Sequence, residues 1–507
     1  MIESIQQAVK QHDPHQLEIK LDYELLSASK TKYHISTYIF VPHTLGISPE
    51  SYPRHLFYRD AQSYIRLKTP ALNLREFVES QRSPLSKIKG IIAVAGWIAD
   101  PTAQQRLITQ LKLLSATFAS ALREHYAFLD QRVTEAEQGE HIKTHHLIRN
   151  LVNEFLTQTP ALIQAFRDLF ADFNLPHVPE QIYSAYVNTD ESLSLLVEES
   201  AAEMFLVVDS YFKRQERDEF KAALQKLAQQ ESKHRRSRGY LSVLKLDNDN
   251  EAYLSQASRL KKYASSVLFL DIAIESEGAY LMQLIYALAA GLSMVFATGL
   301  AFYFQARYGN FTLPVFVALV IGYMFKDRIK ELGRLLFARQ LEDRLFDRRI
   351  RIRTQDGQHN LGVLKEKVRF VSERDLPATV LRDRRRDTVS NVFAEGREEK
   401  IICHTREITL NCATINEVFP DFPEITGLND IWRYDVRHFL NRMAGPEQER
   451  LLFHDGQLVP VTGQKVYAVN VISRFRAVQP KLGKMNSRLQ LILNRNGIKR
   501  IETFPVE

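Results

Sequence analysis

Apolar and charged residues alternate along residues 17–25, a period of two that is typical of a strand with one buried face. Residues 33–41 are rich in β-branched and aromatic side chains and predict a second strand. The two strands are expected to pair as a hairpin across residues 27–32. The chain therefore predicts a small β element near its N-terminus.

Helical spacing of apolar residues dominates the next part of the chain. Leucine and phenylalanine side chains recur on one face between Leu107 and Leu122, after a capping pattern formed by Thr102 and Gln105. Thr159-Pro160 predicts the start of another helix, because proline is favoured in the first turn. These patterns predict a mainly helical body after the β element.

Two runs without charged residues then follow, at residues 278–306 and 308–325. A helix needs about 20 apolar residues to cross about 30 Å of hydrocarbon. The runs therefore predict two antiparallel membrane-spanning helices, at about residues 280–303 and 308–325. The alternative, a buried hairpin in a soluble core, is disfavoured because adjacent uncharged runs of this length are rare in soluble proteins.

The last third of the chain predicts a β module. Asp455-Gly456 and Asn496-Gly497 are dipeptides typical of hairpin turns with positive φ at both central residues. Residues 466–475 have the composition of a strand. We expect this module to be mainly antiparallel.

Together these patterns predict an α+β membrane protein in which a helical N-terminal domain and a β-rich C-terminal domain flank a transmembrane hairpin. The predicted divisions are 1–270 for the N-terminal domain (β-hairpin, then helices), 271–325 for the transmembrane hairpin, 326–350 for a basic juxtamembrane helix and 351–507 for the β-rich domain.

The charge distribution predicts the orientation. Residues 326–353 hold ten Lys and Arg against five Asp and Glu, and basic flanks remain on the cytoplasmic side of a membrane. Both termini are therefore expected in the cytoplasm, at a bacterial inner membrane. Residues 1–278 carry a net charge of −3 and residues 326–507 a net charge of +9. Anionic lipid headgroups are the expected partner of this basic half, and nucleic acid is disfavoured because no recognition motif is present.

Small residues occur at four-residue spacing in the first predicted span: Ala289, Ser293, Ala297 and Ala301. Such a strip lets a second helix approach closely. It could pack on the second span of the same chain, or form a contact with a second copy or another membrane protein. Neither predicted span contains an ionisable residue, which argues against a transporter or pump.

Candidate chemistry is sparse. His141 and His145 lie four residues apart and would face one way on a helix, which could bind a metal ion. A solvated helix face is the favoured explanation, because the His-Glu-x-x-His pattern is absent. We expect no cofactor, because no phosphate-binding glycine loop, nucleophile elbow or dinucleotide motif occurs.

Two compact basic runs could contact anionic lipid or phosphate, or could be exposed loops with incidental charge. Their basic residues are Lys233, Arg235, Arg236 and Arg238 in the first run and Arg382, Arg384, Arg385 and Arg386 in the second.

The function expected from these features is that of a two-pass membrane protein acting as a membrane-tethered scaffold, sensor or assembly partner. The alternative is a membrane-anchored enzyme with its site in the helical domain. The sequence contains no catalytic motif, which favours the first.

Overall fold

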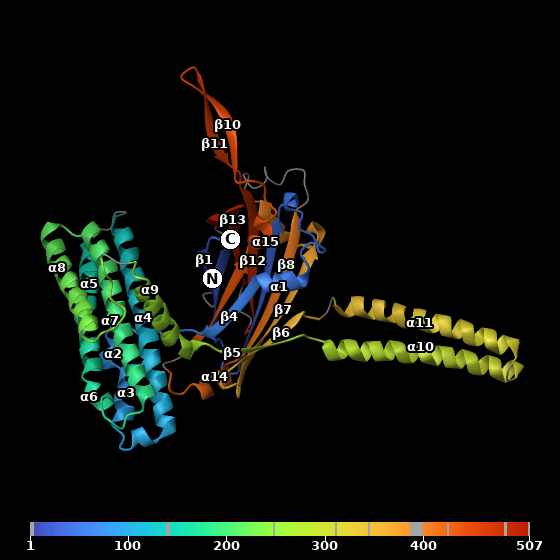
Figure 1. Ribbon diagram of the computed structural model, residues 1–507, viewed down its shortest axis with the longest axis horizontal. Coiled ribbons are helices and arrows are strands. Elements are labelled where there is room, and N and C mark those ends of the chain that lie inside the picture. Colours follow the sequence, from blue (N-terminus) through green and yellow to red (C-terminus); the bar gives the residue numbers. More distant parts are fainter. Residues whose placement is uncertain are drawn as a thin grey trace. The chain divides into compact units, whose positions relative to one another are not determined.

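The computed structural model describes residues 5–137, 142–246, 249–309, 312–342, 345–385, 399–422, 425–480 and 484–504. The expected α+β class is confirmed, with a helical central region and β-rich sheets (Figure 1). The chain forms two compact units. The β unit comprises Met1–Ile65, Leu270–Ile415 and Asn429–Glu507, and the helical unit comprises Arg66–Phe269 and Asn416–Leu428.

The larger sheet of the β unit has eight strands, and neighbouring strands are antiparallel. In spatial order they are β14 (Gly497–Phe504), β13 (Lys484–Asn494), β12 (Tyr467–Gln479), β3 (Lys30–Val41), β8 (Lys400–Asn411), β7 (Asn360–Val371), β6 (Arg348–Arg353) and β5 (Asp271–Glu275).

A second sheet has four strands, in the order β1 (Ile5–Asp13), β2 (Gln16–Glu24), β9 (Gly427–Asp435) and β4 (Ala61–Leu67). A separate hairpin consists of β10 (Glu447–His454) and β11 (Gln457–Gln464). Short helices in the β unit are α1 (Arg54–Asp60), α12 (Ala378–Arg385), α14 (Cys412–Val418) and α15 (Arg437–Leu440).

One prediction about the N-terminal strands is wrong. The strands near residues 17–25 and 33–41 exist as β2 and β3, but they do not pair with each other: β2 lies between β1 and β9, and β3 lies between β12 and β8. The physical reason is burial, because the last five residues of β3 are all buried and a strand lies on each side of it. The β unit therefore draws its strands from both ends of the chain.

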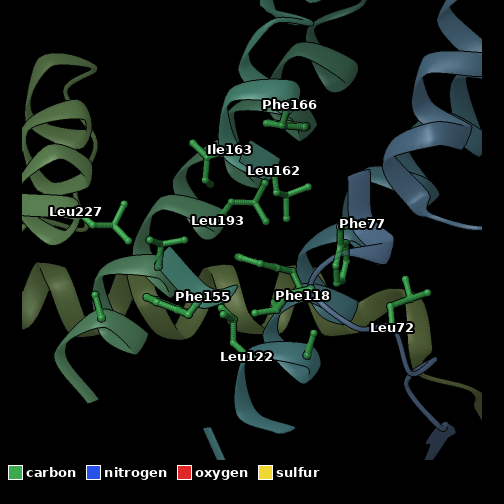
Figure 2. Close-up of a cluster of buried hydrophobic side chains, with 14 of the residues drawn as sticks. Leu72, Phe77, Phe118, Leu122, Phe155, Leu162, Ile163, Phe166, Leu193 and Leu227 are labelled. Carbon is green, nitrogen blue, oxygen red and sulfur yellow. The ribbon is translucent and has the colours of Figure 1, made fainter. Parts of the chain in front are cut away.

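The helical unit is built from long helices around an apolar core. The elements are α2 (Glu76–Glu79), α3 (Pro84–Ile92), α4 (Pro101–Glu137), α5 (Ile142–Arg167), α6 (Phe170–Phe173), α7 (Glu180–Tyr211), α8 (Arg214–Ser237) and α9 (Glu251–Ser265). Phe118, Phe155 and Phe166 are buried at its centre (Figure 2). The predicted apolar face between Leu107 and Leu122 is confirmed as part of this core.

Two helices remain in the β unit. They are α10 (Ala279–Tyr308) and α11 (Leu313–Glu342), and they lie side by side (Figure 1). Residues beyond 325 continue α11, as predicted for the basic segment, and β6 begins at Arg348, within the range where the helix was expected to continue.

A buried polar network connects the two sheets of the β unit. The Arg406 guanidinium on β8 contacts Glu366 on β7 at 3.0 Å and Asp430 on β9 at 2.6 Å. Tyr23 on β2 donates its hydroxyl to Asp430 at 3.2 Å. Burial alone would raise the pKa of Glu366, but His404 and Arg406 lower it to about 2, so that the carboxylate stays charged.

We expect Arg406→Met to destabilise the β unit strongly, by about 3–5 kcal/mol, because two buried carboxylates would lose their counter-ion. The matched control is Arg500→Met, which removes an exposed ion pair with Glu502 and should leave stability nearly unchanged. Denaturant unfolding of the full chain in mild detergent measures both. Equal stability of the two variants would contradict the structural role given to this network.

Candidate functional site

The helices α10 and α11 form an antiparallel hairpin. Glycine at the end of α10 permits the turn, because Gly309 has a φ of 76°, which side chains disfavour. Pro314 lies in the first turn of α11, where its missing N–H costs little. The connection between the helices is therefore short, and both ends of the hairpin lie at the same side of it.

The strip of small residues lies at the contact between these helices. Ser293 and Ala289 are buried, and a Cβ placed on Gly333 of α11 would lie 3.2 Å from the Cβ of Ala289. A Cβ on Gly322 would lie 3.6 Å from the carbonyl oxygen of Ala297. Small side chains thus let the backbones approach closely. Ala289 and Ala297 of the strip therefore lie against the second helix of the same chain.

The other faces of the hairpin are apolar and exposed. The exposed large apolar residues include Leu284, Leu288, Leu292, Met294, Val295, Phe296 and Phe302 on α10 and Leu313, Phe316, Val317, Leu319, Val320, Ile321, Met324, Phe325, Leu332, Leu335 and Leu336 on α11. Contiguous exposed apolar surface of this kind is typical of membrane or protein contacts. Within the described ranges, Met282–Tyr308 is the one stretch of helix long and apolar enough to cross a membrane.

The predicted second span is shorter in the structure than expected. Tyr308 belongs to α10, and α11 begins only at Leu313. The uncharged part of α11 therefore runs from residue 313 to residue 325, about 20 Å at 1.5 Å per residue. This length is below the roughly 30 Å of a hydrocarbon core.

A second exposed apolar feature is the hairpin β10–β11. Every residue of both strands is exposed, including Leu451, Phe453 and Leu458. Asp455 and Gly456 both have positive φ, as predicted for this turn. An isolated two-stranded hairpin is only marginally stable in water, so a partner that covers these side chains would stabilise it.

One arginine of the first basic run, Arg235, is buried inside the helical unit. Arg235 is fully buried, donates to the Ser242 carbonyl at 2.8 Å and to the Ser194 hydroxyl at 3.0 Å, and pairs with Glu198. Burial lowers the pKa of Arg235 to about 10. Arg238 stacks over the Phe170 ring at 4.5 Å. Lys233 and Arg236 are both exposed, so both are available to an anionic ligand.

The second run is divided in the same way. Arg382 is exposed, but Arg384 is buried and contacts Glu399 at 2.8 Å. The side chain of Arg385 and the whole of Arg386 lie outside the described residues. Periodicity gave no indication that one arginine of each run is buried.

The candidate metal pair cannot be assembled from the described chain. His141 lies outside the described residues, and His145 contacts Glu216 at 3.2 Å and packs against Tyr211 and Phe212. The described residues contain no group of three metal-ligating side chains.

A cleft of about 440 Å³ lies in the helical unit, where the enzyme alternative would place its site. The polar groups that line it are paired with one another. The Arg106 guanidinium binds the Asp421 carboxylate at 2.7 and 2.9 Å, and Lys87 and Gln110 donate to the Asp421 carbonyl. Burial lowers the pKa of Lys87, but the described residues that line the cleft include no serine, threonine, cysteine or histidine.

A buried acid is central to the helical unit. The Asp190 carboxylate on α7 accepts hydrogen bonds from Arg167 at 2.9 Å, His234 at 2.7 Å and the Tyr240 hydroxyl at 2.9 Å. Burial raises the pKa of Asp190, yet the bonds from His234 and Arg167 outweigh it and hold the pKa below its usual value. The sequence gave no signal for this group, because its members come from separate helices.

No protein-family model, no curated protein and no solved structure matches this chain.

The lowered pKa of Asp190 predicts acid sensitivity. A carboxyl group whose pKa is lower in the folded state stabilises it above the unfolded pKa, near 3.9, and this contribution is lost as the pH falls below that value. Thermal unfolding between about pH 6 and pH 3 should therefore depend less steeply on pH in Asp190→Asn than in the wild type. The exposed Asp218→Asn is the control, and an unchanged slope in Asp190→Asn would contradict the assignment.

Proposed function

We propose that this chain is a membrane-tethered scaffold or assembly partner, anchored by the hairpin α10–α11. The observation that carries the proposal is the apolar surface of this hairpin, which is exposed along α10 and along α11 from Leu313 to Phe325. Water around such a surface is unfavourable, and lipid is the solvent in which it is stable. The anchor holds the β unit and the helical unit at a bilayer surface.

The proposed orientation places both units in the cytoplasm. Both ends of the hairpin emerge at one side, and the basic segment that begins at Lys326 favours the cytoplasmic side. A bacterial inner membrane and its anionic headgroups fit this charge distribution. Exposed Lys233, Arg236 and Arg382 remain candidates for headgroup contact.

The proposed assembly surface is the hairpin β10–β11, and its proposed partner is a second copy of this chain. Hydrocarbon is excluded as its environment, because a two-stranded sheet has unpaired backbone groups along both edges. The two-residue turn makes His454 and Gln457 a hydrogen-bonded pair. Because such pairs alternate along the ladder, Leu451 and Pro460 form a non-hydrogen-bonded pair, whose backbone groups point away from the partner strand. Pro460 removes a donor from the β11 edge, whereas the β10 edge stays complete.

Joining two β10 edges gives a closed assembly. The product is a four-stranded sheet with a proline-blocked β11 at each side, so addition stops at two copies. The enzyme alternative gains no comparable support, since the polar groups in the helical-unit cleft bind one another.

The anchor is tested by Leu288→Glu, Val295→Glu and Phe302→Glu in one chain. Each charge in hydrocarbon costs about 2.5–3.5 kcal/mol, so the variant should no longer float with lipid vesicles or resist a carbonate wash. The matched control places glutamate at Leu206, Leu241 and Leu246, which are exposed apolar residues of the helical unit. Wild-type flotation by the hairpin variant would refute the anchor.

The assembly surface is tested by Leu451→Pro. This position directs its backbone outward, so the hairpin should persist while its open edge loses a donor. Light scattering of the purified full chain in mild detergent should detect two copies for the wild type and one for Leu451→Pro. Thr462→Pro changes the edge already blocked by Pro460 and should keep two copies. A wild type that is a single copy would disprove the pairing.

A further inference from the structure

The hairpin α10–α11 has unequal apolar lengths on its two helices. The first helix is uncharged from Ala279 to Ala306, whereas α11 is uncharged only from residue 313 to residue 325. Because Gly322 packs against Ala297 and Gly333 against Ala289, the level of each residue along the hairpin is known. Lys326 and the charged residues after it lie beside the stretch of α10 between Ala289 and Ala297.

At this level the hairpin has two different sides. The side of α10 at this level carries Leu292 and Val295, both more than half exposed. The side of α11 carries Asp327, Arg328 and Glu331, which are also exposed, and exposed Leu332, Leu335 and Leu336 follow them in the chain. Nearer the loop, both helices present apolar side chains. The uncharged surface is therefore bounded by an oblique line across the hairpin.

The slope of this line follows from helix geometry. The uncharged surface begins at Ala279 on α10, but on α11 it begins only level with about residue 294 of α10, a difference of about 22 Å along the axis. Packed helices lie only about 8–10 Å apart. A membrane surface that follows the line is therefore inclined by only about 20–25° to the helices.

We propose that α10–α11 enters the bilayer obliquely from one side, with α10 deeper, and ends near the bilayer centre without crossing. A 30-residue helix is about 45 Å long and at this inclination descends about 17 Å, roughly half of the hydrocarbon thickness. The occupant of the exposed apolar surface is thus the acyl region of one leaflet. This inference rests on the proposed membrane anchor and adds its depth and direction.

A comparison of buried charges decides between this insertion and a full crossing. A crossing would place Lys326, Asp327, Arg328, Lys330 and Glu331 in or beside the hydrocarbon. Oblique insertion places only Arg307 there, and its guanidinium donates to the Tyr303 hydroxyl at 3.1 Å and faces the Tyr308 ring. Oblique insertion therefore removes fewer charges from water.

Depth-dependent quenching tests the inference. Leu288, Val295 and Phe302 are each more than half exposed, and each is replaced singly by cysteine in the full chain and labelled with an environment-sensitive fluorophore. Cys403 and Cys412 are buried, and labelling of the wild type gives their background. The chains are incorporated into vesicles of phosphatidylcholine and phosphatidylglycerol that contain nitroxide lipids with shallow or deep spin labels.

For oblique insertion, quenching by the deep nitroxide should increase from Leu288 to Val295 to Phe302. Deepest quenching at Val295, with Phe302 shallower, would overturn the inference and leave the anchor intact, because the loop would then lie at the far surface. Absence of quenching at all three positions would overturn the anchor itself.

A second variant tests the cause. Replacing Lys326, Asp327, Arg328, Lys330 and Glu331 by leucine lengthens the apolar part of α11, so the hairpin should cross and the deepest position should move from Phe302 to Val295. The control exchanges each residue for one of the same charge, such as Lys326→Arg and Asp327→Glu, and should keep Phe302 deepest. An unchanged depth in the leucine variant would show that these charges do not limit insertion, and would refute the argument.

Discussion

Large apolar side chains that stay exposed on a helix are unfavourable in water, and this constraint determines the environment that the hairpin α10–α11 requires. In α10–α11 small residues such as Ala289 and Gly333 form the contact between the helices, and many of the large apolar side chains stay exposed. Hydrophobic burial elsewhere follows the ordinary pattern, with phenylalanine and leucine inside the helical unit. The apolar side chains of the hairpin therefore need to be covered by something other than this chain.

Buried charged groups, unlike the apolar side chains of the hairpin, find their partners within the chain. Arg406 in the β unit and Arg167 and Arg235 in the helical unit are each held by acids or carbonyl groups drawn from several elements. Such groups cost free energy to desolvate, but once paired they penalise any arrangement that separates the partners. They help to define which strands and helices belong together. None of them opens into a cleft with an unpaired nucleophile among the described residues.

The sequence predicted the features that depend on short stretches of chain. Absence of charge located the apolar hairpin, and helical spacing identified the core face between Leu107 and Leu122. It failed where partners are distant. The strand β3 takes its neighbours from beyond residue 399, and no local pattern specifies that choice. Pro160 was expected to begin a helix, yet it lies inside α5, where the Thr159 hydroxyl bonds the Phe155 carbonyl. The candidate site was partly predictable. The absence of charge indicated its apolar faces. The short uncharged run of α11 was not predicted, because α10 continues to Tyr308 and α11 begins only at Leu313.

The placement of β3 has a consequence for the order in which the protein is made. During synthesis β3 leaves the ribosome early, but β8 and β12, the two strands that flank it, are translated only after α10–α11. The larger sheet therefore cannot close until the apolar hairpin has already emerged. Domains generally fold as units during synthesis, and unpaired strand edges are prone to aggregate. Delivery of the nascent chain to a membrane would thus precede completion of the sheet, and β3 must be protected during the interval.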